Sequence, residues 1–227
     1  MKLSWRIELP QLVVIAAMFA AAAWSWSRVP DQIPTHWNLR GEIDGYGSKP
    51  VGLLLLPSIV AGTYLLMLLV PLVDPGRANY RNFAKAYNAF RIVLVLFLGV
   101  VYVVGLLAAF GQHVDMTMVM FLALSALFLV IGNFMGKIRP NWFVGVRTPW
   151  TLSSKLSWDK THRLAGWLFG LMGVVFGVTA FVETTWMFIA AFGVTGICVV
   201  WMVVYSYFVY RRDPHRLPPA GTTPESE

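Results

Sequence analysis

Residues 51–73 read VGLLLLPSIVAGTYLLMLLVPLV, and this stretch decides the fold class of the chain. It contains no Asp, Glu, Lys or Arg, and it exceeds the length of about 20 residues with which a helix crosses a hydrocarbon core. Its apolar residues are not confined to one helical face, as they are in an amphipathic surface helix. Pro57 and Pro71 lie inside it, where neighbouring helices can absorb a kink. The stretch is therefore predicted to be a transmembrane helix.

Five further stretches of the same kind lie at 9–26, 92–111, 116–135, 164–182 and 184–210. Charged residues make up only 13% of the 227 positions, whereas a soluble domain has about a quarter. We therefore predict an all-α polytopic membrane protein with six transmembrane helices. Residues 1–210 should form one membrane domain, and the polar segment 211–227 a disordered cytoplasmic tail.

The first stretch has an alternative interpretation. A basic start, an apolar run and the small residues at 20–23 resemble a secretory signal peptide. Its length is at the upper limit of such peptides, and Trp24 and Trp26 are typical interfacial anchors. A retained helix is the better interpretation.

Basic residues lie beside the apolar stretches and mark orientation. With the N-terminus inside, 15 of the 18 Lys and Arg residues fall in inner segments, and Arg28, Arg40 and Lys49 alone fall in outer ones. This asymmetry predicts that both termini are cytoplasmic. Because the net charge of +7 arises beside the membrane, it indicates contact with membrane lipids and not with nucleic acid. The spans as bounded above contain no charged residue, which argues against a proton- or ion-coupled transporter.

The outer loop, residues 28–50, is the first of two unusually long connections. Pro30 and Pro34 favour extended backbone, and three glycines permit left-handed turns. Asp44–Gly45 is a strong turn dipeptide. We expect a compact, ordered lid with aromatic side chains at headgroup depth. The candidates for binding a ligand there are His36, Trp37, Asn38, Glu42, Asp44 and Tyr46. A metal held by the histidine and two carboxylates of this set is a weak alternative, and no metal is predicted.

The inner loop, residues 132–163, is the second long connection. Thr148 followed by Pro149 fits a helix N-terminus, Ser153 is a second capping candidate, and a helix should run from there into the fifth span. On this helix Asp159 should lie between Lys155 and Arg163 at i, i+4 spacing, and Trp158 should pair with His162. Candidates for binding a partner are Asn133, Arg139, Asn141, Trp142, Arg147, Trp150, Ser154, Trp158, Asp159, His162 and Arg163.

Three alternatives concern the inner loop and the two halves of the chain. A basic interfacial helix could simply contact anionic lipid. A serine hydrolase would use Ser153 or Ser154 with His162 and Asp159, but no glycine-rich elbow surrounds the serines, so no enzyme activity and no cofactor are predicted. Finally, the two long loops each follow the first helix of a three-helix half and share an Ile and Trp spacing, which would fit an inverted-repeat transporter.

Both loops resemble the signature segments of the SdpI family of bacterial immunity proteins. The outer IPTHWN at 33–38 and GEIDGYGSK at 41–49 resemble the family's N-terminal domain of unknown function, assigned here to 1–73. The inner GN at 132–133, RPNWFVGVRTPWTLSS at 139–154, Trp158 and KTHR at 160–163 resemble its second signature, assigned to 116–210. Gly136 stands where the family pattern has Pro, and Lys155 where it has an acidic residue. The second change reverses a charge and puts in doubt what the inner loop binds.

This resemblance implies a non-enzymatic role in a bacterial cell (inner) membrane. An extracellular toxic peptide would meet the outer loop, and a cytoplasmic repressor protein would be held at the inner one. The expected function is therefore immunity and signal transduction, with a transporter as the alternative.

Overall fold

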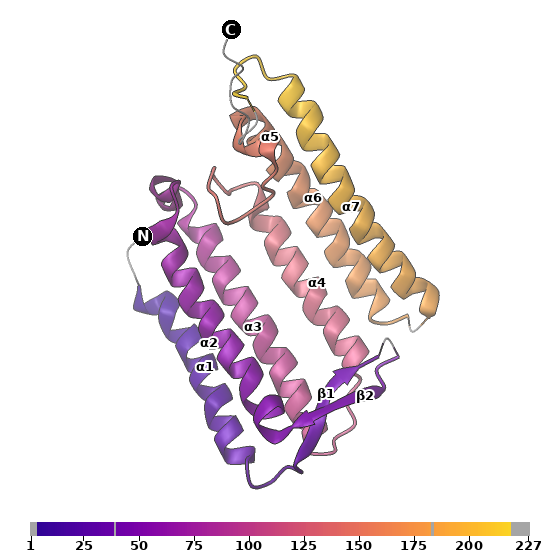
Figure 1. The fold of residues 1–227 in the computed structure, drawn as a ribbon. Coiled ribbons are helices and arrows are strands. Elements are labelled where there is room, and N and C mark those ends of the chain that lie inside the picture. The colour runs from indigo at the N-terminus through magenta and orange to yellow at the C-terminus, as the bar shows by residue number, and fades with distance from the viewer. Residues whose placement is uncertain (1–3, 39, 183, 219–227) are drawn as a thin grey trace.

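The computed structural model describes residues 4–38, 40–182 and 184–218. Six long helices run side by side in it, and each is long and apolar enough to cross a membrane (Figure 1). They are α1 (Trp5–Ser25), α2 (Lys49–Val73), α3 (Ala84–Ala109), α4 (Met116–Met135), α6 (Lys155–Thr179) and α7 (Thr185–Arg211). The predicted fold class and the six spans are confirmed. Apolar residues on the outward faces, such as Leu66, Trp186 and Ile197, are 61%, 79% and 71% exposed, which is expected where hydrocarbon is the solvent.

The helices form two groups of three that pack in different ways. In the first group α1, α2 and α3 each contact the other two, whereas in the second α6 lies between α4 and α7. The groups meet where α3 packs on α4. Gly132 of α4 lies so close to α6 that an added Cβ would be 2.8 Å from the Gly166 carbonyl oxygen, so this contact depends on glycine. The different packing gives no support to an inverted repeat.

The outer loop forms a two-stranded antiparallel sheet, which the all-α prediction did not include. Strand β1 (Gln32–Trp37) pairs with β2 (Ile43–Ser48), with irregular register around His36. Figure 1 shows this hairpin lying across one end of the helices, which we call the hairpin end. The side chain of Ile33 is 2% exposed, and it packs against Ala22, Leu53 and Ala109 of the first three helices. An ordered lid was expected, and this buried anchor accounts for its order.

The position of the hairpin turn corrects the sequence analysis. The turn is not at Asp44–Gly45, which lies inside β2. It closes at residues 38–42, where the Asn38 backbone N–H donates to the Glu42 carbonyl at 2.9 Å. The Asn38 side-chain oxygen also accepts from the backbone N–H groups of Arg40 and Glu42. Gly41 has a φ of 75°, in the left-handed region. This Asx-type turn therefore sets the register.

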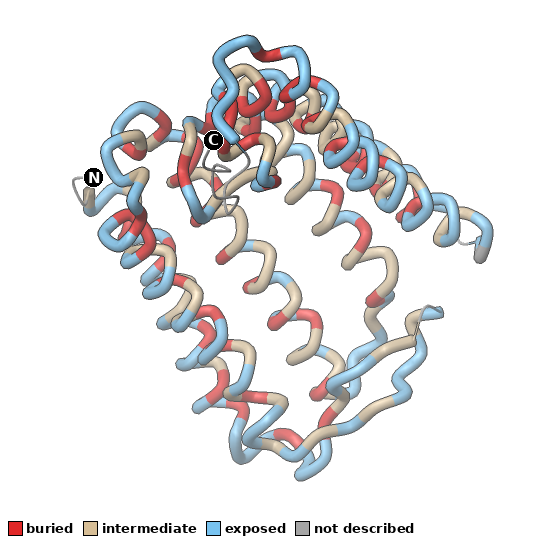
Figure 2. The backbone as a smooth tube through the Cα atoms, turned by 45° about the horizontal axis from the view of Figure 1, so that its top comes forward, coloured by how far each residue is buried: buried red, intermediate tan, exposed pale blue. Residues whose placement is uncertain are grey.

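The opposite end, which we call the loop end, carries the inner loop, a short 3-10 helix η1 (Arg77–Arg81) and α5 (Pro149–Leu152). Thr148 caps α5 in a capping box with Thr151, and Pro149 is the first helical residue, as predicted. The cap of α6 is Ser154 and not Ser153. Helix α6 then runs without interruption into the fifth span, as expected. Figure 2 shows that buried residues are concentrated on the facing sides of the helices and at this end.

The segment after α7 differs from the disorder expected from residue 211 onwards. Asp213 is 6% exposed and accepts a hydrogen bond from the Ser154 hydroxyl at 2.5 Å. The Leu217 N–H donates to the Ser153 carbonyl, and the Tyr210 hydroxyl donates to the Leu217 carbonyl. Residues up to 217 are thus attached to the α5–α6 junction. The predicted tail residues 219–227 lie outside the described part of the chain, as does Glu183.

Candidate functional site

The six outer candidates gather on the hairpin, and we call them the hairpin surface: His36, Trp37, Asn38, Glu42, Asp44 and Tyr46. The structure joins four of them in two pairs across the hairpin. His36 Nδ1 lies 2.5 Å from Asp44 Oδ1, and the Asn38 amide donates to Glu42 at 2.7 Å. A metal site would need His36, Asp44 and Glu42 together, but Glu42 bonds to Asn38 and not to His36. The residues that the structure describes contain no group of three metal ligands.

Two apolar chambers lie beneath the hairpin surface, one on each side of Trp37. Chamber A has a volume of about 280 Å³ and is walled by β1, α2 and α3. Chamber B has a volume of about 330 Å³ and is walled by β1, α3, α4 and α7. Thr35, Trp37 and Val101 line both, so the indole of Trp37 belongs to a shared wall. The hairpin therefore presents polar groups outward and covers apolar space.

At the loop end, Asn141 organises the inner loop. It is 2% exposed, and its side-chain oxygen accepts from the backbone N–H groups of Phe143 and Val144 at 2.9 and 2.6 Å. Its amide donates to the carbonyls of Arg139 and Val144 at 2.9 and 3.0 Å. Since one buried side chain holds the turn from both sides, Trp142 and Phe143 are displayed on rigid backbone, 49% and 42% exposed.

Asp74 links this loop to the end of α2, and sequence reasoning missed it. Its carboxylate is 1% exposed and accepts from the Tyr80 hydroxyl at 2.8 Å, the Gly76 N–H at 2.6 Å and the Trp142 N–H at 3.1 Å. Burial and the hydrogen bond to Asp74 raise the pKa of the Tyr80 hydroxyl, so it remains a donor. An acidic residue directly after an apolar run was the signal available.

His162 supports the inner loop from below. Its Nε2 accepts from the Val146 N–H at 3.1 Å, so Nδ1 carries the hydrogen and donates to the Trp158 carbonyl at 2.8 Å. The ring stacks on Trp158 with centroids 4.1 Å apart, which confirms the predicted pair. Both imidazole nitrogens are occupied by backbone groups, and the Ser154 hydroxyl donates to Asp213. The Ser–His–Asp arrangement that a serine hydrolase would need is not assembled.

The other inner candidates lie nearer the surface. Arg147 donates to the Trp142 carbonyl at 2.6 Å, and Trp150 packs edge-on against Tyr207. Asp159 lies 3.8 Å from Arg139. Among the described residues, no ion pair joins Asp159 to Lys155 or Arg163, its expected partners. Asn133 and Arg163 are exposed. We call the rigid turn with its basic neighbours the platform: Arg139, Asn141, Trp142, Phe143 and Arg147.

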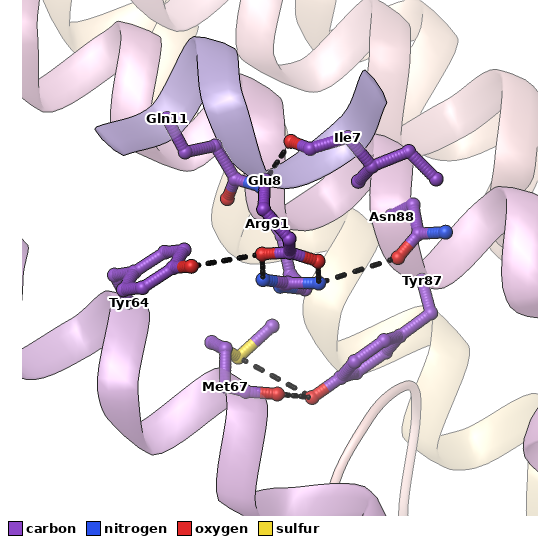
Figure 3. A network of polar contacts seen from close by, with 8 residues as sticks. All are labelled: Ile7, Glu8, Gln11, Tyr64, Met67, Tyr87, Asn88 and Arg91. Atoms are coloured by element: carbon purple, nitrogen blue, oxygen red, sulfur yellow. Dashed lines mark hydrogen bonds and ion pairs between the residues drawn. The ribbon is translucent and has the colours of Figure 1, made fainter. Parts of the chain in front are cut away.

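A buried ion pair corrects the statement that the spans are free of charge. Glu8 of α1 and Arg91 of α3 lie inside helices that extend beyond the uncharged stretches, because α1 begins at Trp5 and α3 at Ala84. Arg91 Nη2 lies 2.5 Å from Glu8 Oε2, and the two residues are 1% and 6% exposed (Figure 3). Tyr64 of α2 donates to the same carboxylate at 2.9 Å. The pair therefore connects all three helices of the first group.

The fold defines a six-helix polytopic membrane protein, with the hairpin surface at one end and the platform at the other. Residues 137–206 match the model of the SdpI/YfhL protein family, and residues 13–61 match that of a domain of unknown function, DUF1648. The chain is also 21% identical to the immunity protein SdpI of Bacillus subtilis (strain 168), over 88% of this chain and 94% of that protein. The resemblance to the SdpI family is confirmed, and the chain is a multi-pass protein of a bacterial membrane. No solved structure matches the chain significantly.

Proposed function

We propose that this chain is an immunity and signal-transducing protein that gives resistance to a secreted, membrane-active toxic peptide. The observation that carries the proposal is the similarity to the immunity protein SdpI over 88% of the chain, which includes the hairpin surface and the platform. In this proposal the hairpin surface meets the peptide. Its Tyr46 is 62% exposed and its His36 side chain 72% exposed, so an aromatic and a titratable group are both accessible there.

Helix α2 offers a direct connection between the two ends. Strand β2 ends at Ser48, which is also the residue that precedes α2, so no linker separates hairpin and helix. At its other end α2 is followed at once by Asp74, which binds the Trp142 N–H of the platform. A displacement of the hairpin would therefore move the group that holds the platform. We propose that the platform then binds a cytoplasmic repressor and holds it at the membrane.

Survival of cells with and without the gene, challenged by membrane-active peptides, tests the proposal. Expression of the chain should raise the lethal peptide concentration, and Trp37→Ala should abolish this protection. Trp167→Ala is the matched control, because Trp167 is 78% exposed on α6 and belongs to neither the hairpin surface nor the platform. Arg147→Ala should leave protection intact and abolish recovery of the repressor with the membrane fraction. If the chain protects but Trp37→Ala protects equally well, the assignment of the hairpin surface is wrong.

A transporter is the second candidate function, and the ion pair of Glu8 and Arg91 favours it. Charged residues inside transmembrane helices are costly and often mark ion or substrate pathways. Uptake of labelled peptide or small solutes into sealed vesicles that contain the chain, with none into vesicles that lack it, would support this candidate. Protection without any uptake would favour the immunity protein.

A further inference from the structure

We propose that chambers A and B are the two acyl-chain subsites of one bound phospholipid with an amine headgroup, held beneath the hairpin. This inference does not depend on the proposed immunity function. It depends on what the chamber walls contain, on where the chambers open, and on the charges of the hairpin above them.

The chambers open toward hydrocarbon. Leu55 and Ile59, which line chamber A, are 53% and 46% exposed on α2, and Phe192 of chamber B is 53% exposed on α7. All three belong to helices that are long and apolar enough to cross the membrane. An apolar space that opens toward hydrocarbon is filled by lipid tails and not by water, because water would find too few polar partners.

The two chambers adjoin, which favours one lipid with two chains. Trp37 and Val101 line both, and an added Cβ at Gly105 of α3 would lie 4.0 Å from the Trp37 ring. The indole thus separates two spaces of similar size that start at the same strand. Chamber A also contains Tyr102, which is 4% exposed and whose hydroxyl has no hydrogen-bond partner among the described residues. An ester oxygen of a lipid is a group that such a hydroxyl can bind.

Tail burial alone gives no preference, since an acyl chain leaves one apolar medium for another. Selectivity must come from the headgroup, and the hairpin offers negative charge. His36 and Asn38 line chamber B, and they hold the carboxylates of Asp44 and Glu42. Neither carboxylate forms an ion pair with Lys or Arg in the part of the chain that the structure describes. A primary ammonium group can pair with such carboxylates, whereas they repel an anionic headgroup.

Native mass spectrometry of the purified full chain tests this inference. The protein is incubated with an equimolar mixture of phosphatidylethanolamine and phosphatidylglycerol with the same chains, and retained lipid is measured. We expect one phosphatidylethanolamine per protein. Val101→Trp places an indole in the space next to the shared wall and should lower lipid retention about tenfold, which corresponds to about 1.4 kcal/mol in binding free energy. Leu107→Trp is the control, because Leu107 is 41% exposed on the same helix and lines neither chamber.

Glu42→Gln with Asp44→Asn tests the headgroup separately. These residues are on the surface of the hairpin, so folding should not change. The preference for phosphatidylethanolamine over phosphatidylglycerol should fall about fivefold, as expected for a partly exposed charge pair. Equal retention by the Val101→Trp and Leu107→Trp variants, or an unchanged preference after charge removal, overturns the inference. Binding of two single-chain lipids as tightly as one two-chain lipid also overturns it, as does retention of a cationic amphipathic peptide in place of lipid. Failure of protection in cells bears only on the proposed function.

Discussion

Glu8 and Arg91 are 83 positions apart in the sequence and form an ion pair with a distance of 2.5 Å between Oε2 and Nη2, inside the first group of helices. Tyr64 of α2, the remaining helix of the group, donates a hydrogen bond to the same carboxylate. Two charges that are so fully buried are stable only because each neutralises the other. The pair therefore specifies how α1, α2 and α3 lie relative to one another.

Removing one partner of this pair should destabilise the protein. Glu8→Gln leaves the Arg91 charge uncompensated, and the expected cost is about 3–5 kcal/mol in the free energy of unfolding. Replacing both residues, Glu8→Gln with Arg91→Met, should cost less than Glu8→Gln alone, since no unpaired charge remains. Thermal unfolding in detergent measures both variants, with the exposed Glu42→Gln as control. A double variant that is less stable than the single one would contradict this account.

Gly145 and Gly136 form a matched pair of positions at the loop end. Gly145 has a φ of 112°, and an added Cβ would lie 2.3 Å from Nε2 of His162. Gly145→Ala should therefore cost about 1–3 kcal/mol from the backbone alone, and it should break the bond between His162 and the Val146 N–H. At Gly136 the nearest atom to an added Cβ is 3.7 Å away, so Gly136→Ala should be tolerated. Equal thermal stability of the two variants would show that the inner loop is not rigid.

The attachment of the C-terminal segment should depend on pH. The hydrogen bond from Ser154 holds the pKa of the Asp213 carboxyl below its ordinary value of 3.8. Since the folded-state pKa is lowered, its contribution to stability is present above the ordinary pKa and is lost as pH falls through the lowered one. Hydrogen exchange at the Leu217 N–H, corrected for its intrinsic rate, should show protection at neutral pH that disappears in acid. In Asp213→Asn this pH dependence should be absent, and its persistence would assign the effect to another group.

The orientation expected from the basic residues remains a prediction. Tyr46→Cys and Lys155→Cys, each introduced with Cys198→Ala, place a thiol at the hairpin end and at the loop end. An impermeant maleimide added to intact cells should label the first variant and not the second, because basic segments stay in the cytoplasm. Labelling of both thiols from the same side would overturn the assignment of outer and inner surfaces.

The membrane helices could be derived from the sequence because hydrocarbon is an unspecific solvent. Any run such as 51–73 that lacks charge and exceeds the core thickness must be helical there, whatever its neighbours are. The Thr148 cap before Pro149 and the pairing of Trp158 with His162 were equally accessible, since they join residues within about one helical turn. These features are local, so the sequence alone is enough to predict them.

Tertiary structure decided the features that join distant residues. Hydropathy began the first and third spans at Leu9 and Ile92, just after Glu8 and Arg91, because it scores each charge as if it faced lipid alone. It cannot represent a partner 83 positions away. The Asp44–Gly45 dipeptide was overruled because Asn38 closes the turn earlier and Ile33 fixes the register by burial. The hydrogen bond from the Trp142 N–H to Asp74 joins residues that are 68 positions apart in the sequence. Chain order alone thus determined which segments cross the membrane, and packing decided which polar groups are paired inside it, because pairing depends on proximity in space.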